Sequence, residues 1–206
     1  HIYSQKLEVL KGIDDTSTGL SVADAFDSVK LWHLAKTNGR PTILSMSWGS
    51  NYTVSGNPVG GNYRGVDWTY TNQTDSEMWG LYGLMIPISA GNRVIGATIT
   101  ATDVDVQDCI DAGIHVVIAA GNEYRKCDLP GASDYNNTVQ GTINGNVYTL
   151  PYVRPNSPFS PNAFNVGNVH HTTWFWADDS TYRDRVSDSS NRGSAINIWA
   201  SGTYIM

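Results

Sequence analysis

The sequence predicts an α/β domain with a mostly parallel sheet, flanking helices and one long loop-rich insertion. Apolar segments of strand length alternate along the chain with segments of helical periodicity. Strands that alternate with helices pair in parallel, because each crossover helix returns the chain to the same end of the sheet. The expected strands are residues 5–11, 42–47, 114–120, 163–169 and 195–200, and the expected helices are residues 21–38 and 102–112.

The first half opens with a predicted strand, helix and strand. Residues 5–11 alternate polar and apolar side chains, as a half-buried strand does. Ser21 and Asp24 have the spacing of a capping box, so a helix is expected to begin there, and Asn38 with Gly39 is expected to end it. The positions expected to pack this helix on the sheet are Val22, Ala25, Phe26, Val29, Trp32 and His33.

Residues 51–97 differ from the rest of the chain. They are rich in glycine and aromatic residues and have poor periodicity, which predicts an elaborated surface insertion. Its aromatic side chains either pack the insertion against its own host or, if exposed, bind sugar or protein. The aromatic residues concerned are Tyr52, Tyr63, Trp68, Tyr70, Trp79 and Tyr82.

The second half carries the most informative segment of the chain. Thr102 is expected to cap a helix that ends before Gly113. An apolar run follows over 114–120 and ends in Gly121 and Asn122, which predicts a buried parallel strand that delivers one amide side chain at its end. Such a neutral donor can stabilise negative charge that develops on an oxygen atom, although an ordinary turn is the simpler interpretation. Further on, Asn144-Gly145 is the signal of a type I′ hairpin.

Composition limits the classes of function. The 206 residues are 40% hydrophobic and 16% charged, which is typical of one globular domain with a lightly charged surface. A net charge of -6 argues against a nucleic-acid partner or an anionic membrane surface, and no apolar run approaches the ~20 residues that span a bilayer. The chain begins at His1 and ends in apolar Ile205-Met206, so both ends are interpreted as cuts through a longer polypeptide, and 1–206 as a partial domain.

The cysteines and histidines do not form a recognisable site in the sequence. Cys109 and Cys127 lack the spacing of a metal pair and are interpreted as two ordinary thiols, with a disulfide as the alternative. His115 lies within the predicted buried strand and is expected to be a core histidine. His170 and His171 are expected to be a surface pair, with a transition-metal site as the minor alternative, and no metal ligand is assigned.

Four motifs, in order, resemble the subtilisin-like serine peptidases (subtilases). They are Leu7–Gly12, Ile43–Ser50, Val116–Asn122, and Asn165–Val169 followed by Ile196–Gly202. They are similar to the family segments written V-K-V-L-G, I-N-M-S-L-G-G, V-V-A-A-A-G-N, and A-V-G-A-V followed by D-V-M-A-P-G. The resemblance implies the central part of a subtilisin-like catalytic domain.

The resemblance also implies roles for individual residues. Asn122 matches the family's oxyanion-hole asparagine, next to Ala120 and Gly121 at the strand end. Ser47-Trp48-Gly49 matches the segment that pairs with the extended substrate and walls its first specificity pocket, with Trp48 in place of the usual leucine. Gly19 lies near the second substrate-pairing strand. The segment Ser89–Asn92 also ends in Gly-Asn, but Pro87 interrupts its apolar run, so Asn122 is preferred.

The catalytic triad of the family is missing from the chain. No Asp, His or Ser motif of the family occurs, and Ser201 replaces a family proline. By itself the chain is therefore not expected to hydrolyse peptides. Two hypotheses follow: a peptidase domain whose triad lies in flanking segments, or a non-catalytic domain of a large assembly such as a phage virion. The expected partner is an extended peptide or an assembly protein, and the expected location is extracellular or virion-associated. No cofactor is expected, and a structural calcium ion stays an alternative that no motif here supports.

Overall fold

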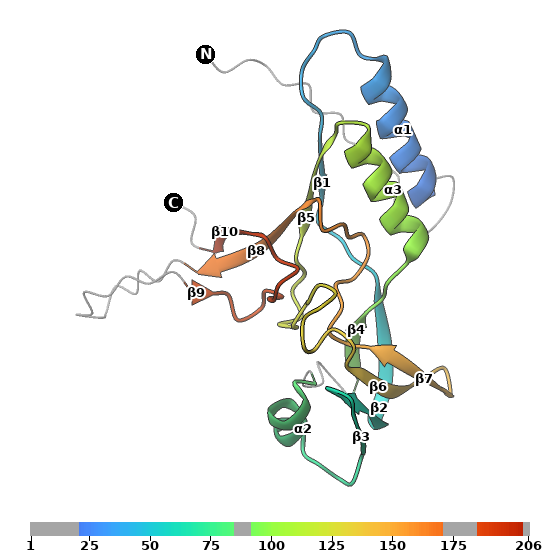
Figure 1. The fold of residues 1–206 in the computed structure, drawn as a ribbon, viewed down its shortest axis with the longest axis vertical. Coiled ribbons are helices and arrows are strands. Elements are labelled where there is room, and N and C mark those ends of the chain that lie inside the picture. Colours follow the sequence, from blue (N-terminus) through green and yellow to red (C-terminus); the bar gives the residue numbers. More distant parts are fainter. Residues whose placement is uncertain (1–20, 85–91, 171–184, 204–206) are drawn as a thin grey trace, which may run out of the picture.

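The computed structural model describes residues 21–84, 92–170 and 185–203. The strands of these residues form two separate sheets, and each sheet takes strands from several parts of the sequence (Figure 1). The predicted strand at 5–11, the predicted substrate-pairing Gly19, Pro87 and His171 lie outside the described residues.

The first sheet is mostly parallel, as predicted. Its strands run in the order β1 (Ile43–Met46), β5 (His115–Ala119), β8 (Phe164–His170) and β10 (Ile198–Thr203), all parallel, and β9 (Arg185–Val186) pairs antiparallel with β8. This order places the carboxyl ends of four strands at the same edge of the sheet.

Two helices cover one face of this sheet, as Figure 1 shows. Helix α1 (Val22–Ala35) begins with the predicted capping box between Ser21 and Asp24. Helix α3 (Thr100–Asp111) begins two residues earlier than expected, and Thr102 is not its cap. The Thr102 side chain is buried inside the first turn instead, and Gly113 follows the helix with a φ of 90°.

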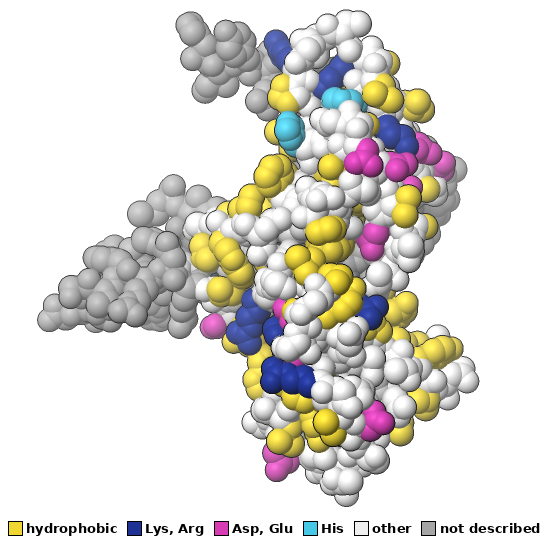
Figure 2. Space-filling model, viewed as in Figure 1, with side chains coloured by type: hydrophobic (Ala, Val, Ile, Leu, Met, Phe, Trp, Pro, Cys, Tyr) yellow, Lys and Arg dark blue, Asp and Glu magenta, His cyan; other side chains and the backbone are white. Residues whose placement is uncertain are grey.

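The opposite face of the first sheet is open among the described residues. Burial alternates along β5, so Val116 and Ile118 are buried under the helices whereas His115 is exposed. The prediction of a core histidine at His115 is therefore wrong, because it assumed that both faces of the strand are covered. Figure 2 shows hydrophobic side chains at the surface over this sheet and acidic ones over the helices.

The described residues of the 51–97 segment are not loop-rich, which corrects the prediction for the insertion. They form β2 (Asn51–Tyr63), β3 (Val66–Thr69), helix α2 (Asp75–Tyr82) and β4 (Arg93–Gly96). Strands β6 (Thr138–Ile143) and β7 (Asn146–Pro151) complete a second, antiparallel sheet in the order β3-β2-β6-β7, with β4 also on β2. The prediction failed because glycine obscures strand periodicity, yet Gly60 and Gly61 lie where β3 and β6 leave no room for a Cβ atom.

The aromatic residues of this region pack mainly on one another and on the second sheet. Trp68 is buried and stacks on Tyr82 with ring centroids 4.3 Å apart, and Tyr63 meets Tyr82 edge-on at 5.9 Å. Trp79 stacks on Tyr124 at 5.6 Å. These contacts support the packing interpretation over an open sugar-binding surface.

The β6–β7 hairpin has the predicted turn. Asn144 and Gly145 have φ values of 49° and 82°, and positive φ at both central residues is the mark of the type I′ turn.

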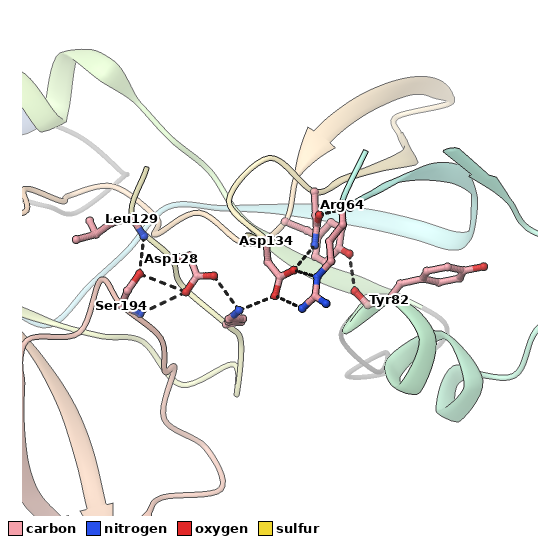
Figure 3. A network of polar contacts seen from close by, with 9 residues as sticks. Arg64, Tyr82, Asp128, Leu129, Asp134 and Ser194 are labelled. Atoms are coloured by element: carbon pink, nitrogen blue, oxygen red, sulfur yellow. Dashed lines mark hydrogen bonds and ion pairs between the residues drawn. The ribbon is translucent and has the colours of Figure 1, made fainter. Parts of the chain in front are cut away.

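A chain of charged side chains joins the two sheets (Figure 3). Asp134 accepts a hydrogen bond from Arg64 Nε at 2.6 Å and one from Lys126 Nζ at 2.5 Å. Lys126 also pairs with Asp128 at 2.9 Å, and Asp128 accepts hydrogen bonds from Ser194, near the start of β10. The chain thus runs from the β2–β3 turn to the first sheet. The Arg64 guanidinium, together with Lys126, holds the pKa of the buried Asp134 carboxyl well below its usual range.

We expect Asp134→Asn to lower the free energy of unfolding by about 2 kcal/mol at neutral pH, since it removes hydrogen bonds between charged groups. Because the folded-state pKa of Asp134 is depressed, its stabilisation is full above the unfolded-state pKa near ~3.9 and is lost as the pH falls further. Urea unfolding at several pH values should show a constant gap to the wild type above about pH 5 that narrows below about pH 4. The exposed Asp27→Asn is the control, expected within ~0.5 kcal/mol; an equal effect of both variants would contradict this account.

Candidate functional site

A cleft of about 280 Å³ lies on the open face of the first sheet and extends to the carboxyl ends of the parallel strands. Clefts at the carboxyl ends of parallel strands are the usual place for ligands in α/β proteins. All four parallel strands contribute to the walls. The lining residues are Ser45–Ser47, Val117, Ala119–Asn122, Val166–Asn168, Ser190 and Ala200–Gly202.

The turn that follows β5 brings Asn122 to this cleft. Ala120 is buried, Gly121 has a φ of 96°, and Asn122 is exposed and lines the cleft. A Cβ atom on Gly121 would lie 2.5 Å from Asn191 Nδ2 and 2.6 Å from Glu123 Oε2, so the position requires glycine for both its backbone conformation and its space. The Asn122 side chain makes no hydrogen bond to the other described residues, which leaves its amide available to a ligand.

Asn191 holds the turn from the opposite side. Its Nδ2 donates to Ala120 O at 2.8 Å and to Glu123 Oε2 at 2.7 Å. Its Oδ1 accepts from the backbone N–H of Glu123 at 3.1 Å and of Arg125 at 2.9 Å, and its own N–H donates to Gly121 O at 3.1 Å. The side chain is completely buried. One residue thus fixes the backbone on both sides of Asn122.

The predicted substrate-pairing segment is only partly at the cleft. Ser47 is exposed and lines it, directly after the last residue of β1. Trp48 is half-buried and packs on the core under the helices, and Gly49 lies against the Asn156 side chain; neither lines the cleft. Asn92, the alternative to Asn122, precedes β4 in the second sheet and is not among the lining residues.

The remaining polar residues of the cleft were not predicted from the sequence. Asn168 Oδ1 accepts the backbone N–H of Gly202 at 2.8 Å, and the backbone N–H of Asn168 donates to Ser190 Oγ at 2.9 Å. These bonds tie β8 to β10 and to the loop before β10. Asn191 was missed as well, because its contacts span 66 to 71 residues of sequence and no local pattern signals them.

The chemistry available in the cleft is that of neutral donors and acceptors. Among the described residues, those that line it include no Asp, Glu, His, Lys or Arg, so they supply no general acid or base. The two cysteines are free and buried, and burial raises the pKa of both thiols to about 11, which keeps them protonated at neutral pH. In residues 21–84, 92–170 and 185–203 no group of three or more His, Cys, Asp or Glu side chains could hold a metal ion.

None of the described helices is both long and apolar enough to cross a membrane. Neither a protein-family model, nor a curated protein, nor a solved structure matches the chain.

Proposed function

We propose that the chain is the central part of a subtilisin-like serine endopeptidase domain. It supplies an oxyanion-binding amide at Asn122 and a substrate-pairing segment at Ser47–Gly49, whereas the catalytic triad comes from polypeptide outside residues 1–206. The position of Asn122 carries this proposal: an exposed, uncharged amide on a rigid turn, at the carboxyl end of a parallel strand, in an uncharged cleft.

The geometry suits an extended peptide. Ser47–Gly49 continue β1 beyond its last paired residue, Met46, so their backbone can pair with a peptide strand by main-chain hydrogen bonds. Because Ser47 and Asn122 line the same cleft, we infer that a peptide carbonyl group held beside Ser47 would face the Asn122 amide. As a nucleophile attacks, negative charge develops on the carbonyl oxygen. A preorganised amide therefore stabilises the transition state more than it stabilises the uncharged carbonyl group of the bound substrate.

The cleft also favours uncharged side chains. Its walls include Val117, Ala119, Val166 and Ala200, with serine and asparagine as the polar residues. A charged substrate side chain would lose its hydration there and find no opposite charge among the described lining residues. We therefore infer that a peptide enters with an apolar or small side chain at this point.

The test compares the 206-residue chain with a longer polypeptide that includes its natural flanks. Both are incubated with a fluorogenic extended peptide and with a fluorophosphonate probe, which labels activated serine. We expect hydrolysis and labelling of the longer polypeptide only, with the label on a serine beyond residue 206. If the longer polypeptide neither cleaves the peptide nor takes the label, the peptidase proposal is wrong.

A second candidate, a non-catalytic domain of a large assembly such as a virion, is favoured by the open face of the first sheet. Ile43, Phe164 and Ile198 lie on this face and are 66%, 44% and 38% exposed. Parallel sheets are normally covered on both faces, so these side chains suit a protein contact. In this case the flanks would lack at least one member of the triad, and the longer polypeptide would be inactive but part of an extracellular or virion assembly.

A further inference from the structure

A second, much smaller cavity lies beside the second sheet, away from the residues that line the cleft. Its volume is about 10 Å³, which is room for one water-sized particle. Three cationic residues, Arg93, Arg125 and Lys126, form part of its wall, and no carboxylate does among the described residues. The other lining residues are Gly83, Leu84, Val94, Ile95, Tyr152 and Val153.

Arg125 is the unusual member of this wall. Its side chain is only 3% exposed, and its guanidinium is incompletely paired. Nη2 donates to Asn156 Oδ1 at 3.2 Å and lies 3.8 Å from Glu123 Oε2, beyond hydrogen-bond range. Nε and Nη1 are buried and have no acceptor among the described residues. Burial of a charged donor without an acceptor is strongly unfavourable, so an acceptor that is not part of the described protein is required.

The neighbouring cations already have carboxylate partners. Arg93 is 1% exposed and pairs with Asp75, which is 43% exposed. Lys126 pairs with Asp128 and Asp134 in the chain of charges that joins the sheets. Glu123, the acid nearest to Arg125 Nη2, already accepts a hydrogen bond from Asn191. The charge of Arg125 is therefore the least compensated of the three.

We propose that this cavity binds one small monatomic anion of the halide class, with Arg125 as its principal donor. A halide ion accepts from several N–H groups at once and compensates the charge, whereas a water molecule is neutral and leaves the charge uncompensated even when its oxygen accepts from the guanidinium. A monatomic halide is smaller than phosphate or sulfate, and it is therefore the anion that so small a cavity admits most readily. Gly96 makes the arrangement feasible, because a Cβ atom there would collide with Arg125 Nη1.

Such an anion would join β4 to the segment that follows the Asn122 turn. Arg93 belongs to β4, and Arg125 is three residues beyond Asn122 and hydrogen-bonded to Asn191 through its backbone. An anion that binds only the folded state raises the free energy of unfolding. Once the anion concentration exceeds the dissociation constant, this increase grows with the logarithm of the concentration. The structure thus predicts a halide-dependent stability that is independent of any peptidase activity.

The experiment measures the Tm of the chain in sodium chloride and in sodium gluconate at equal ionic strength. We expect Tm to be higher in chloride by about 2–4 °C. In Arg125→Met, which keeps the bulk but removes the donors, the chloride effect should disappear. The exposed Arg40→Met is the matched control and should keep it. Equal Tm values in the two salts for the wild type would overturn the site, as would a chloride effect that persists in a folded Arg125→Met protein.

A crystallographic measurement on the wild type keeps the test decisive if Arg125→Met does not fold. Crystals grown in sodium bromide should show an anomalous peak in this cavity, within hydrogen-bond range of Arg125 Nε or Nη1. A cavity that holds only water, or bromide peaks confined to the protein surface, would contradict the proposal. A peak in the cavity without a chloride effect on Tm would show an adventitious ion only, and would contradict it too.

Discussion

Replacement of Asn191 by Ala is expected to lower the free energy of unfolding by about 4 kcal/mol, because several buried groups lose their partners at once. Nδ2 and Oδ1 of this residue make four hydrogen bonds to the turn around Asn122, and its side chain is completely buried. Water cannot replace these bonds without entering the protein. The Glu123 carboxylate and the backbone N–H groups of Glu123 and Arg125 would be left unsatisfied, at about 1–3 kcal/mol each before relaxation.

Urea unfolding of the two proteins measures this effect, with the m value as the check that the same surface is exposed. Asn136→Ala is the matched control, since Asn136 is exposed and the same atoms are removed. We expect the control to stay within ~0.5 kcal/mol of the wild type. A loss of less than about 1 kcal/mol for Asn191→Ala would mean that the turn is held by other contacts.

The architecture of the first sheet could be predicted because its signals are local. The Ser21–Asp24 capping box and the apolar run before Gly121 each depend on a few neighbouring residues. The same holds for one part of the second sheet, the Asn144-Gly145 turn between β6 and β7. The alternation of strands and helices then fixed the parallel pairing.

The second sheet could not be predicted in the same way. Glycines in β2 were interpreted as loop residues, whereas Gly60 and Gly61 are there because neighbouring strands approach too closely for a side chain. This crowding depends on β3 and β6, and the latter lies more than 70 residues away in sequence. His115 was misplaced for a related reason, because which face of β5 is covered depends on where both helices lie.

In the candidate site, too, residues with a local sequence pattern could be predicted, whereas those that act through distant contacts could not. Asn122 could be singled out because a Gly-Asn pair at the end of an apolar run is a local pattern. Asn191, which holds its turn, could not be found, since it lies in a loop without periodicity and acts only through distant contacts. Trp48 was expected at the cleft from its place in a motif, yet a large apolar side chain at that position packs on the core.

Asn122→Ala is expected to lower kcat of the longer polypeptide by about 100- to 1000-fold, which corresponds to the loss of roughly 3 kcal/mol of transition-state stabilisation. KM should change little, since in the proposed function the amide contributes mainly in the transition state and the Ser47–Gly49 backbone binds the peptide in both states. Stability should change little as well, because Asn122 is exposed and makes no side-chain hydrogen bond to the described residues. This separates Asn122 from Asn191, whose replacement affects folding.

The kinetic comparison of wild type, Asn122→Ala and Asn136→Ala in the longer polypeptide tests the assignment of the cleft most directly. Each protein is first shown to unfold at the same urea concentration, and kcat and KM are then measured with one extended peptide substrate. We expect a large loss of kcat for Asn122→Ala alone, with Asn136→Ala at the wild-type value. An Asn122→Ala protein that is folded and keeps the wild-type kcat would contradict it.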